Sequence, residues 1–94
     1  MNTPPDLKML SKLSGWTMLD GKLHQTFVFA DFAQAFGFIT QVAMKASMMN
    51  HHPQWSNVYT TVVIDLITHS EGSVTQLDVE LATKISDIFN HMSK

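Results

Sequence analysis

The chain has 94 residues, 45% of them hydrophobic, and its six lysines, eight acidic residues and lack of arginine give it a net charge of -2. This length fits one domain over residues 1–94, the composition excludes a disordered or fibrous chain, and the charge argues against a nucleic-acid partner. The absence of cysteine excludes disulfides and thiolate catalysis, and no hydrophobic run approaches the ~20 residues of a membrane helix.

The N-terminal segment predicts a short helix. Thr3 can cap its first turn, Pro4 suits the first helical position, and Asp6 suits the positive end of the helix. Leucines recur along one side of this segment, and Gly15 is well placed to end the helix.

The stretch from Trp16 to Phe29 predicts a β-hairpin, because Asp20-Gly21 is a strong signal for a type I′ turn. One face of the returning strand is expected to carry Leu23, Phe27 and Phe29. The other face is expected to carry His24, Thr26 and Val28. Gln25 interrupts the apolar face.

The clearest helix is predicted from Asp31 to about Asn50. Asp31 is an N-cap candidate with Gln34 three residues later, which is a variant of the capping box. Apolar residues recur at spacings of three and four and are expected on one buried face: Phe32, Ala35, Phe36, Ile39, Val42, Ala43, Ala46 and Met49. Pro53 disfavours helical geometry at the residue before it, so the adjacent histidines fall at a junction between helix and loop.

The stretch from Trp55 to Thr68 is rich in β-formers and longer than an ordinary strand. It predicts either one long strand or a hairpin that turns near Thr60-Thr61, and the alternation of residues does not decide between them. A loop is expected over 70–74.

The last helix is predicted from Thr75 to His91. Thr75 and Asp78 have the spacing of a capping box, which explains Asp78 without a role in catalysis. The buried stripe of this helix is expected to contain Leu81, Ala82, Ile85, Ile88, Phe89 and Met92.

The order of these elements predicts an α+β fold. A helix, two strands, a helix, a β-rich segment and a final helix pack most economically as an antiparallel sheet with amphipathic helices on one face. The other face and the edge strands are left for solvent or for another subunit.

Histidine is the unusual feature of the composition, because the chain has five and two of them are adjacent. His51 and His52 lie at the mouth of a loop, and His69 lies at the end of the β-rich segment. Imidazole has an unperturbed pKa of about 6.5, so three such groups could supply an acid, a base and an orienting donor near neutral pH. The spacing alone leaves open the alternative that the loop histidines are only solvated.

Other chemistries find less support. Three histidines with Asp65 nearby could ligate zinc, but adjacent residues usually point apart, and no histidine pair has the i, i+4 spacing of a helical zinc site. The chain has no serine-nucleophile motif and no glycine-rich phosphate loop. His24 and His91 are expected to be solvated surface residues.

A longer pattern around these histidines is specific to one protein family. The pattern consists of Asn50-His51-His52-Pro53-Gln54-Trp55-Ser56-Asn57-Val58-Tyr59, then Thr68-His69, then Thr75-x-x-Asp78. Further matches are Gly15-Trp16, Leu19-Asp20-Gly21, Phe27-x-Phe29, Asp31-Phe32, Ala35-Phe36-Gly37-Phe38 and Leu81-Ala82. Over about residues 13–88, the chain resembles the pterin-4a-carbinolamine dehydratase family.

The resemblance implies a four-stranded antiparallel sheet with three helices packed on one face, and it favours the hairpin interpretation of residues 55–68. It also implies a homodimer or homotetramer and a pterin substrate, with neither a metal nor an organic cofactor. The implied reaction dehydrates 4a-hydroxytetrahydropterin to quinonoid dihydropterin, which recycles the pterin cofactor of aromatic amino-acid hydroxylases.

The resemblance also implies roles for site residues. His51 and His69 are the expected acid and base, in either order, and His52 is expected to bind and orient the substrate. The positions that match the family's substrate-lining residues are Asn50, Thr68 and Ser70.

Three positions depart from the family pattern. Ser47 stands where the family often has Glu, Ser73 replaces the usual Gly, and Leu77 replaces a common basic residue. We expect catalysis to survive because all three histidines remain, and the departures bear on the polar network and the substrate preference.

Two alternative functions stay open at the level of sequence. One is a non-catalytic dimerisation module of the coactivator type, and the other is a pterin enzyme of molybdopterin metabolism. Whichever function holds, we expect no signal peptide, no membrane association and a cytoplasmic location.

Overall fold

A computed structural model describes residues 3–92 of the chain. Its elements, in chain order, are α1 (Leu7–Ser11), β1 (Thr17–Leu19), β2 (Lys22–Val28), α2 (Phe32–Met49), β3 (Gln54–Val58), β4 (Thr61–Leu66) and α3 (Gln76–Met92). None of the described helices has the length and hydrophobicity that a membrane span requires.

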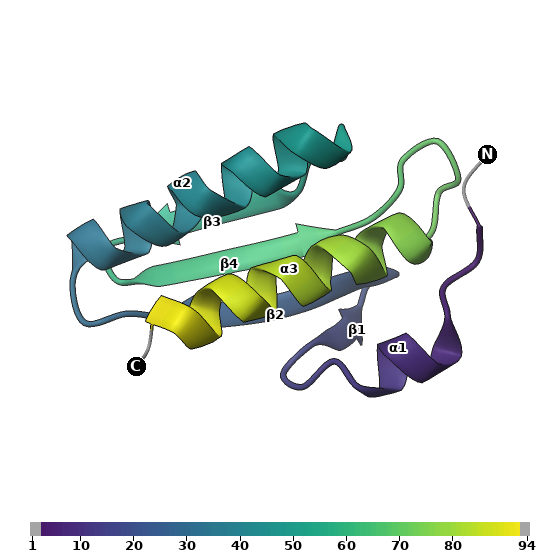
Figure 1. Ribbon diagram of the computed structural model, residues 1–94, viewed down its shortest axis with the longest axis horizontal. Helices are drawn as coiled ribbons and strands as arrows, with labels where there is room; N and C mark the ends of the chain where they lie inside the picture. Colours follow the sequence, from purple (N-terminus) through teal and green to yellow (C-terminus); the bar gives the residue numbers. More distant parts are fainter. Residues whose placement is uncertain (1–2, 93–94) are drawn as a thin grey trace.

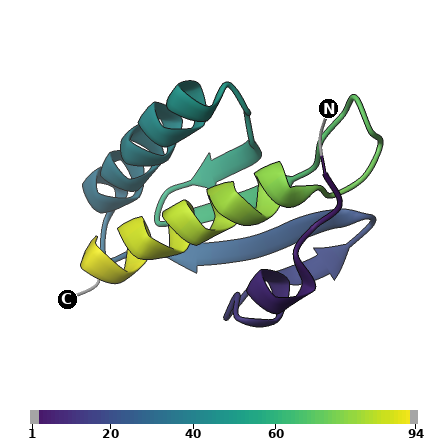
Figure 2. The ribbon, with the colours of Figure 1, turned by 45° about the vertical axis from the view of Figure 1, so that its right-hand side comes forward.

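The four strands form one antiparallel sheet in the order β1-β2-β4-β3. The helices lie on one face of this sheet, with α2 and α3 side by side and α1 next to β1 (Figures 1 and 2). The α+β fold with a four-stranded antiparallel sheet and three helices on one face is therefore confirmed. The opposite face of the sheet carries no helix of the described chain (Figure 2).

Both hairpins turn through residues with positive φ. Asp20 and Gly21 have φ values of 53° and 77°, as a type I′ turn requires, and they join β1 to β2. Tyr59 has a φ of 53° and lies in the turn that joins β3 to β4. The stretch from residue 55 to residue 68 is thus a hairpin followed by a loop, which excludes the single long strand.

The predicted start of the first helix was wrong. Asp6, and not Thr3, is the N-cap of α1, because its carboxylate accepts hydrogen bonds from the backbone N–H groups of Lys8 and Met9. The physical reason is the second proline of the pair, which disfavours helical geometry at Pro4. The helix also ends before Gly15, whose φ of +88° places it in the connection to β1.

The predicted boundaries of α2 are confirmed, but its buried face is rotated. Asp31 caps the helix by accepting from the N–H of Gln34 at 2.8 Å. The buried residues of α2 are Ala35, Phe38, Val42 and Ala46. Phe32 and Phe36 were expected in the core, yet they are 52% and 59% exposed. The helix is apolar on more than one side, so periodicity overestimated the width of its buried face.

The core lies between the sheet and the two long helices. Four residues of the predicted stripe of α3 are buried, and the remaining two pack partly buried against the core. The inward side of β4 contributes Val62, Ile64 and Leu66, all 0% exposed. This packing holds the end of α2, the end of β4 and the start of α3 in fixed positions relative to one another.

Candidate active site

A pocket of about 480 Å³ opens where α2 ends, β4 ends and α3 begins. Its lining residues are Met49, Asn50, His51, His52, Ile67, Thr68, His69, Ser70 and Leu77. All six residues predicted for the site are among them, although they come from two segments separated by the β3–β4 hairpin. The pocket volume falls in the usual range for small-molecule sites.

The end of α2 aims the two adjacent histidines. Asn50 has left-handed geometry, with φ and ψ of 51° and 42°, and its N–H bonds to carbonyls of the last helical turn. Asparagine tolerates this geometry better than other residues with a side chain. The chain therefore turns sharply, and the N–H of His51 donates to the carbonyl of Ala46 at 3.0 Å.

His51 is held by a buried carboxylate. Its Nε2 lies 2.5 Å from Oδ1 of Asp78, and the two residues are 9% and 0% exposed. An ionised carboxylate can only accept hydrogen bonds, so Nε2 carries the proton of this bond and Nδ1 is left for chemistry. The pairing fixes both the tautomer and the orientation of the ring.

The other oxygen of Asp78 completes a directed chain of hydrogen bonds. Its Oδ2 accepts from the Thr68 hydroxyl and from the Thr75 backbone N–H, each at 2.8 Å. Because the Thr68 hydroxyl has only one hydrogen, the Thr75 hydroxyl must donate to it across their 2.7 Å contact. The Leu77 N–H donates to the Thr75 hydroxyl in turn. The start of α3 is thereby tied to the end of β4 and, through Asp78, to His51.

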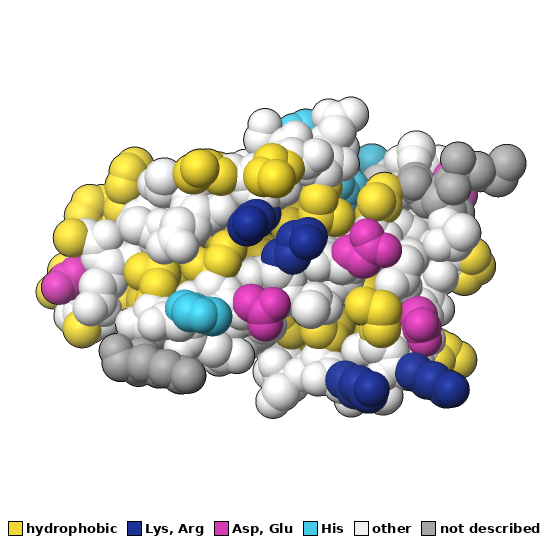
Figure 3. All heavy atoms as spheres, in the orientation of Figure 1, with side chains coloured by type: hydrophobic (Ala, Val, Ile, Leu, Met, Phe, Trp, Pro, Cys, Tyr) yellow, Lys and Arg dark blue, Asp and Glu magenta, His cyan; other side chains and the backbone are white. Residues whose placement is uncertain are grey.

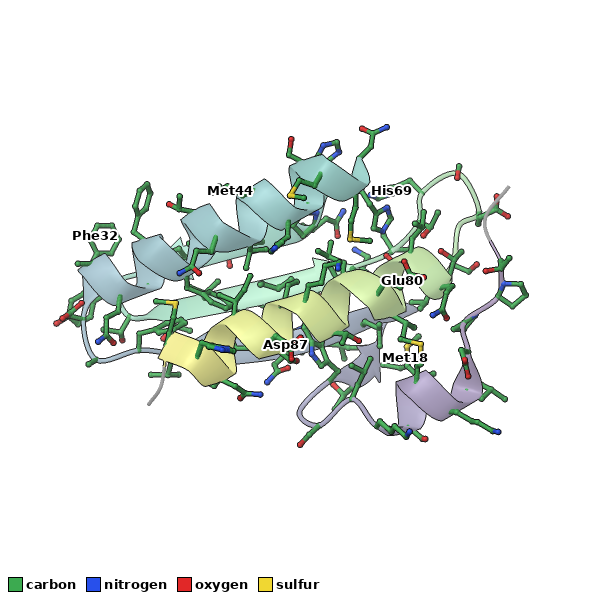
Figure 4. All side chains as sticks on the ribbon, in the orientation of Figure 1. Met18, Phe32, Met44, His69, Glu80 and Asp87 are labelled. Atoms are coloured by element: carbon green, nitrogen blue, oxygen red, sulfur yellow. The ribbon has the colours of Figure 1, made fainter. Side chains whose placement is uncertain are left out.

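His52 and His69 occupy the exposed part of the pocket. Both are exposed to solvent, whereas His51 is buried. Figure 4 shows that His69 lies near the C-terminal end of α2, at the end of the molecule away from Phe32. A tight loop presents His69, because the Gly72 N–H donates to the carbonyls of both Thr68 and His69. The site therefore combines one buried, oriented imidazole with two accessible ones.

The sequence prediction underestimated Asp78. It does form the predicted capping box with Thr75, but the same carboxylate also holds His51 and Thr68. Met49, Ile67 and Leu77 also line the pocket and were not predicted to do so. Each adjoins a residue of the motif in the sequence, and Leu77 is also one of the three positions that depart from the family pattern.

The remaining histidines lie outside the pocket. His24 was expected to be solvated, but its Nδ1 pairs with Asp65 at 2.8 Å across β2 and β4. His91 is exposed, and its Nδ1 donates to the Asp87 carbonyl in the last turn of α3, as expected for a residue at a negative helix end. Within residues 3–92, no cluster of three or more His, Asp or Glu side chains is arranged to hold a metal ion.

Fold and site define a small α+β protein in which three histidines meet at one end of an antiparallel sheet. The family model of pterin 4 alpha carbinolamine dehydratase matches residues 3–88. A provisionally named pterin-4-alpha-carbinolamine dehydratase of Solibacter usitatus is 51% identical over 76 residues, covering 81% of this chain and 80% of its own. A relative with the same provisional name from Jannaschia sp. is 53% identical over 74 residues, covering 77% and 76% of the two chains.

A solved structure is also similar. A crystal structure from Brucella melitensis, described as a transcriptional coactivator/pterin dehydratase, has a TM-score of 0.83 and 42% identity. It covers 88% of this chain and 90% of its own. The chain therefore belongs to the pterin-4a-carbinolamine dehydratase family.

Proposed function

We propose that this protein dehydrates 4a-hydroxytetrahydropterin to quinonoid dihydropterin by histidine acid–base catalysis. The observation that carries this proposal is the meeting of His51, His52 and His69 in one pocket, with the first of them oriented by Asp78. Family membership supports the reaction and the pterin substrate. The physiological role that fits is recycling of the pterin cofactor of aromatic amino-acid hydroxylases.

The reaction needs two proton transfers at neighbouring atoms. The hydroxyl on C4a leaves as water once it is protonated, and the proton on N5 is removed as the C4a=N5 double bond forms. A general acid and a general base that act on the same pterin ring are therefore sufficient, and each contributes typically ~10²–10⁴-fold. We assign these two roles to His51 and His69, in either order, because one ring is fixed and the other is accessible.

The remaining pocket residues bind the substrate in this proposal. His52 orients the pterin ring, and Asn50, Thr68 and Ser70 line the position it occupies. Kinetics can distinguish a residue that only binds the substrate from one that transfers a proton. Loss of binding raises KM, whereas loss of proton transfer lowers kcat. We expect His52→Ala to raise KM more than it lowers kcat.

The direct test is the rate of 4a-hydroxytetrahydropterin loss, followed by its ultraviolet absorbance. The purified protein is expected to accelerate this loss well above the rate in buffer alone. A rate equal to the buffer rate at saturating protein would sink the proposal.

Self-association is a second part of the proposal. We propose a homodimer or homotetramer, supported by a patch of exposed hydrophobic side chains on α2 that we call the α2 patch: Phe32, Phe36, Met44 and Met48. Figure 3 shows hydrophobic side chains gathered along this edge of the molecule. Edge strand β3 pairs on one side only within the described chain.

A cytoplasmic location stays a prediction from the sequence.

A non-catalytic binding module is the alternative function. The exposed α2 patch and the coactivator description of the Brucella protein favour it. A protein that catalyses dehydration at full rate without any partner would count against this alternative.

A further inference from the structure

The histidine pocket depends on the first turn of α3, because Asp78 lies there and holds His51. The N–H groups in the first turn of a helix have no partners within the helix, so this turn is held less firmly than the rest. The loop before it, residues 69–73, is exposed along its whole length. Beyond the capping box with Thr75, support for this turn has to come from another segment of the chain.

The N-terminal segment, residues 3–9, gives that support through Gln76. The Gln76 backbone N–H donates to the carbonyl of Thr3 at 3.0 Å. Its side-chain Oε1 accepts from the Asp6 N–H at 2.6 Å, and its Nε2 donates to the sulfur of Met9 at 3.1 Å. Figures 1 and 2 both show the N-terminal segment running beside the start of α3. One residue of α3 is thus joined at three points to the other end of the chain.

These contacts make the starts of α1 and α3 cap each other. Asp6 is the N-cap of α1, and in a capping box the third helical residue supplies the acceptor for the N–H of the cap. In α1 that residue is Met9, whose thioether is only a weak acceptor. Gln76 supplies the acceptor from α3 instead, and Thr3 supplies one to α3 in return. Two prolines between Thr3 and Asp6 restrict the backbone that links these contacts.

We propose that Gln76 is a positioning residue for the histidine pocket, which acts by locking the N-terminal segment onto the first turn of α3. Gln76 does not line the pocket, but both of its sequence neighbours belong to the site. Thr75 joins the hydrogen-bond chain to Thr68, and Leu77 lines the pocket. Without the contacts of Gln76 this turn is free to shift, and the bond between Asp78 and His51 lengthens with it.

The segment that the sequence indicated only as a helix start therefore supports the site. A small displacement of a catalytic group lowers the rate strongly, so the effect on catalysis is large for a residue outside the pocket. This catalytic part rests on the proposed dehydration, whereas the positioning of His51 does not.

The first test reads the bond between Asp78 and His51 directly. In the ¹⁵N-labelled full chain, NMR records the resonance of the His51 Nε2 proton and its exchange with water. In Gln76→Ala this proton is expected to move upfield and to exchange at least about fivefold faster, as loss of hydrogen bonds of ordinary strength implies. Backbone amides of β4, inside the sheet, are expected to keep their exchange rates.

Two further variants separate positioning from a general loss of stability. Gln76→Glu keeps an acceptor for the Asp6 N–H, and its charge suits the start of a helix, so the His51 proton is expected to exchange within about twofold of its native rate. Gln41→Ala is the matched control, because Gln41 also donates its Nε2 to a methionine sulfur, that of Met92 at the opposite end of α3, at 3.3 Å. This control is expected to leave the His51 proton unchanged.

Dehydration kinetics test the consequence for catalysis. Gln76→Ala is expected to lower kcat about fivefold or more with KM within about twofold, because a proton-transfer group is misaligned while the substrate-lining side chains remain. Gln76→Glu and Gln41→Ala are expected to retain the native kcat. Gln76→Met, which keeps the length of the side chain, gives the same comparison if Gln76→Ala does not fold.

Three results would overturn the proposal: Gln76→Ala matching Gln41→Ala, Gln76→Glu as impaired as Gln76→Ala, or a change in only one of the two readouts of an active protein. If the native chain does not accelerate dehydration but the His51 proton still responds to Gln76→Ala, the proposed dehydration fails and the positioning of His51 stands.

Discussion

Asp78 is the residue on which the geometry of the candidate site depends. A carboxylate that is 0% exposed is costly to bury unless it is hydrogen-bonded, and this one accepts from His51, Thr68 and Thr75. Two of these donors, His51 and Thr68, lie just after the ends of α2 and β4, which are far apart in the sequence. Asp78 therefore does more than cap α3, because it fixes the buried imidazole against the sheet.

Replacing Asp78 with asparagine tests that orienting role. The amide of Asp78→Asn can still accept from the Thr75 N–H, but it no longer offers two acceptor oxygens, so the His51 tautomer is no longer fixed. We expect the dehydration rate to fall about 10²-fold or more with native far-UV circular dichroism. Asp87→Asn, on the exposed side of the same helix, is the control. A rate for Asp78→Asn within twofold of the unmodified protein would contradict the role.

Thr68 links the start of α3 to Asp78 through its hydroxyl. Thr68→Val keeps the shape but removes two hydrogen bonds: the buried Thr75 hydroxyl loses its acceptor, and Asp78 Oδ2 retains only the Thr75 backbone N–H. We expect urea unfolding to show a loss of about 1–3 kcal/mol. Thr26→Val, at an exposed position of β2, is the matched control and should change stability little. Equal stability of the two variants would refute the hydrogen-bond chain.

The histidines could be identified from the sequence, whereas their orienting partner could not. Asp78 stands three residues after Thr75, and this local spacing already accounts for it as a cap. Its contact with His51 spans 27 positions of the chain and exists only once α2 and α3 pack together. His24 shows the same limit, since its pairing with Asp65 depends on the register between β2 and β4.

At the scale of elements, turns were easier to predict than buried faces. Asp20-Gly21 carries its own conformational preference, so its hairpin could be predicted from two residues. Helix α2 offered no such constraint, because its apolar residues cover more than one side. Which of Phe36 and Phe38 is buried is decided by the sheet and α3, and a pattern of spacings contains neither.

The end of α2 gives a test at this scale. Asn50 has positive φ, which is strained for alanine and unstrained for glycine. We expect Asn50→Ala to lower the free energy of unfolding by about 1 kcal/mol or more, and Asn50→Gly to stay close to the unmodified protein. Chemical denaturation of all three proteins measures this difference. An alanine variant as stable as the glycine variant would show that the left-handed turn does not form.

At the scale of the whole molecule, a chain of 94 residues leaves much apolar surface uncovered. Phe36 is 59% exposed and Met48 is 79% exposed on the α2 patch. A small domain buries a small share of its surface by folding, so association between copies adds burial that the chain alone lacks.

The mass in solution tests self-association. Light scattering is expected to give two or four times 10.6 kDa for the unmodified protein. Phe36→Glu places a charge in the α2 patch and is expected to reduce the mass. Leu7→Glu is the control, because Leu7 is 74% exposed and lies outside the patch. A mass of one chain for the unmodified protein would rule out the proposed assembly.

The central claim is that histidines in one pocket transfer the protons of the dehydration. The most direct measurement is the rate of 4a-hydroxytetrahydropterin loss with His51→Ala and with His69→Ala, beside His91→Ala as a control outside the pocket. We predict that each pocket variant loses about 10²–10⁴-fold in kcat with native circular dichroism, while the control retains its rate. Pocket variants that remain as fast as the control would contradict the claim.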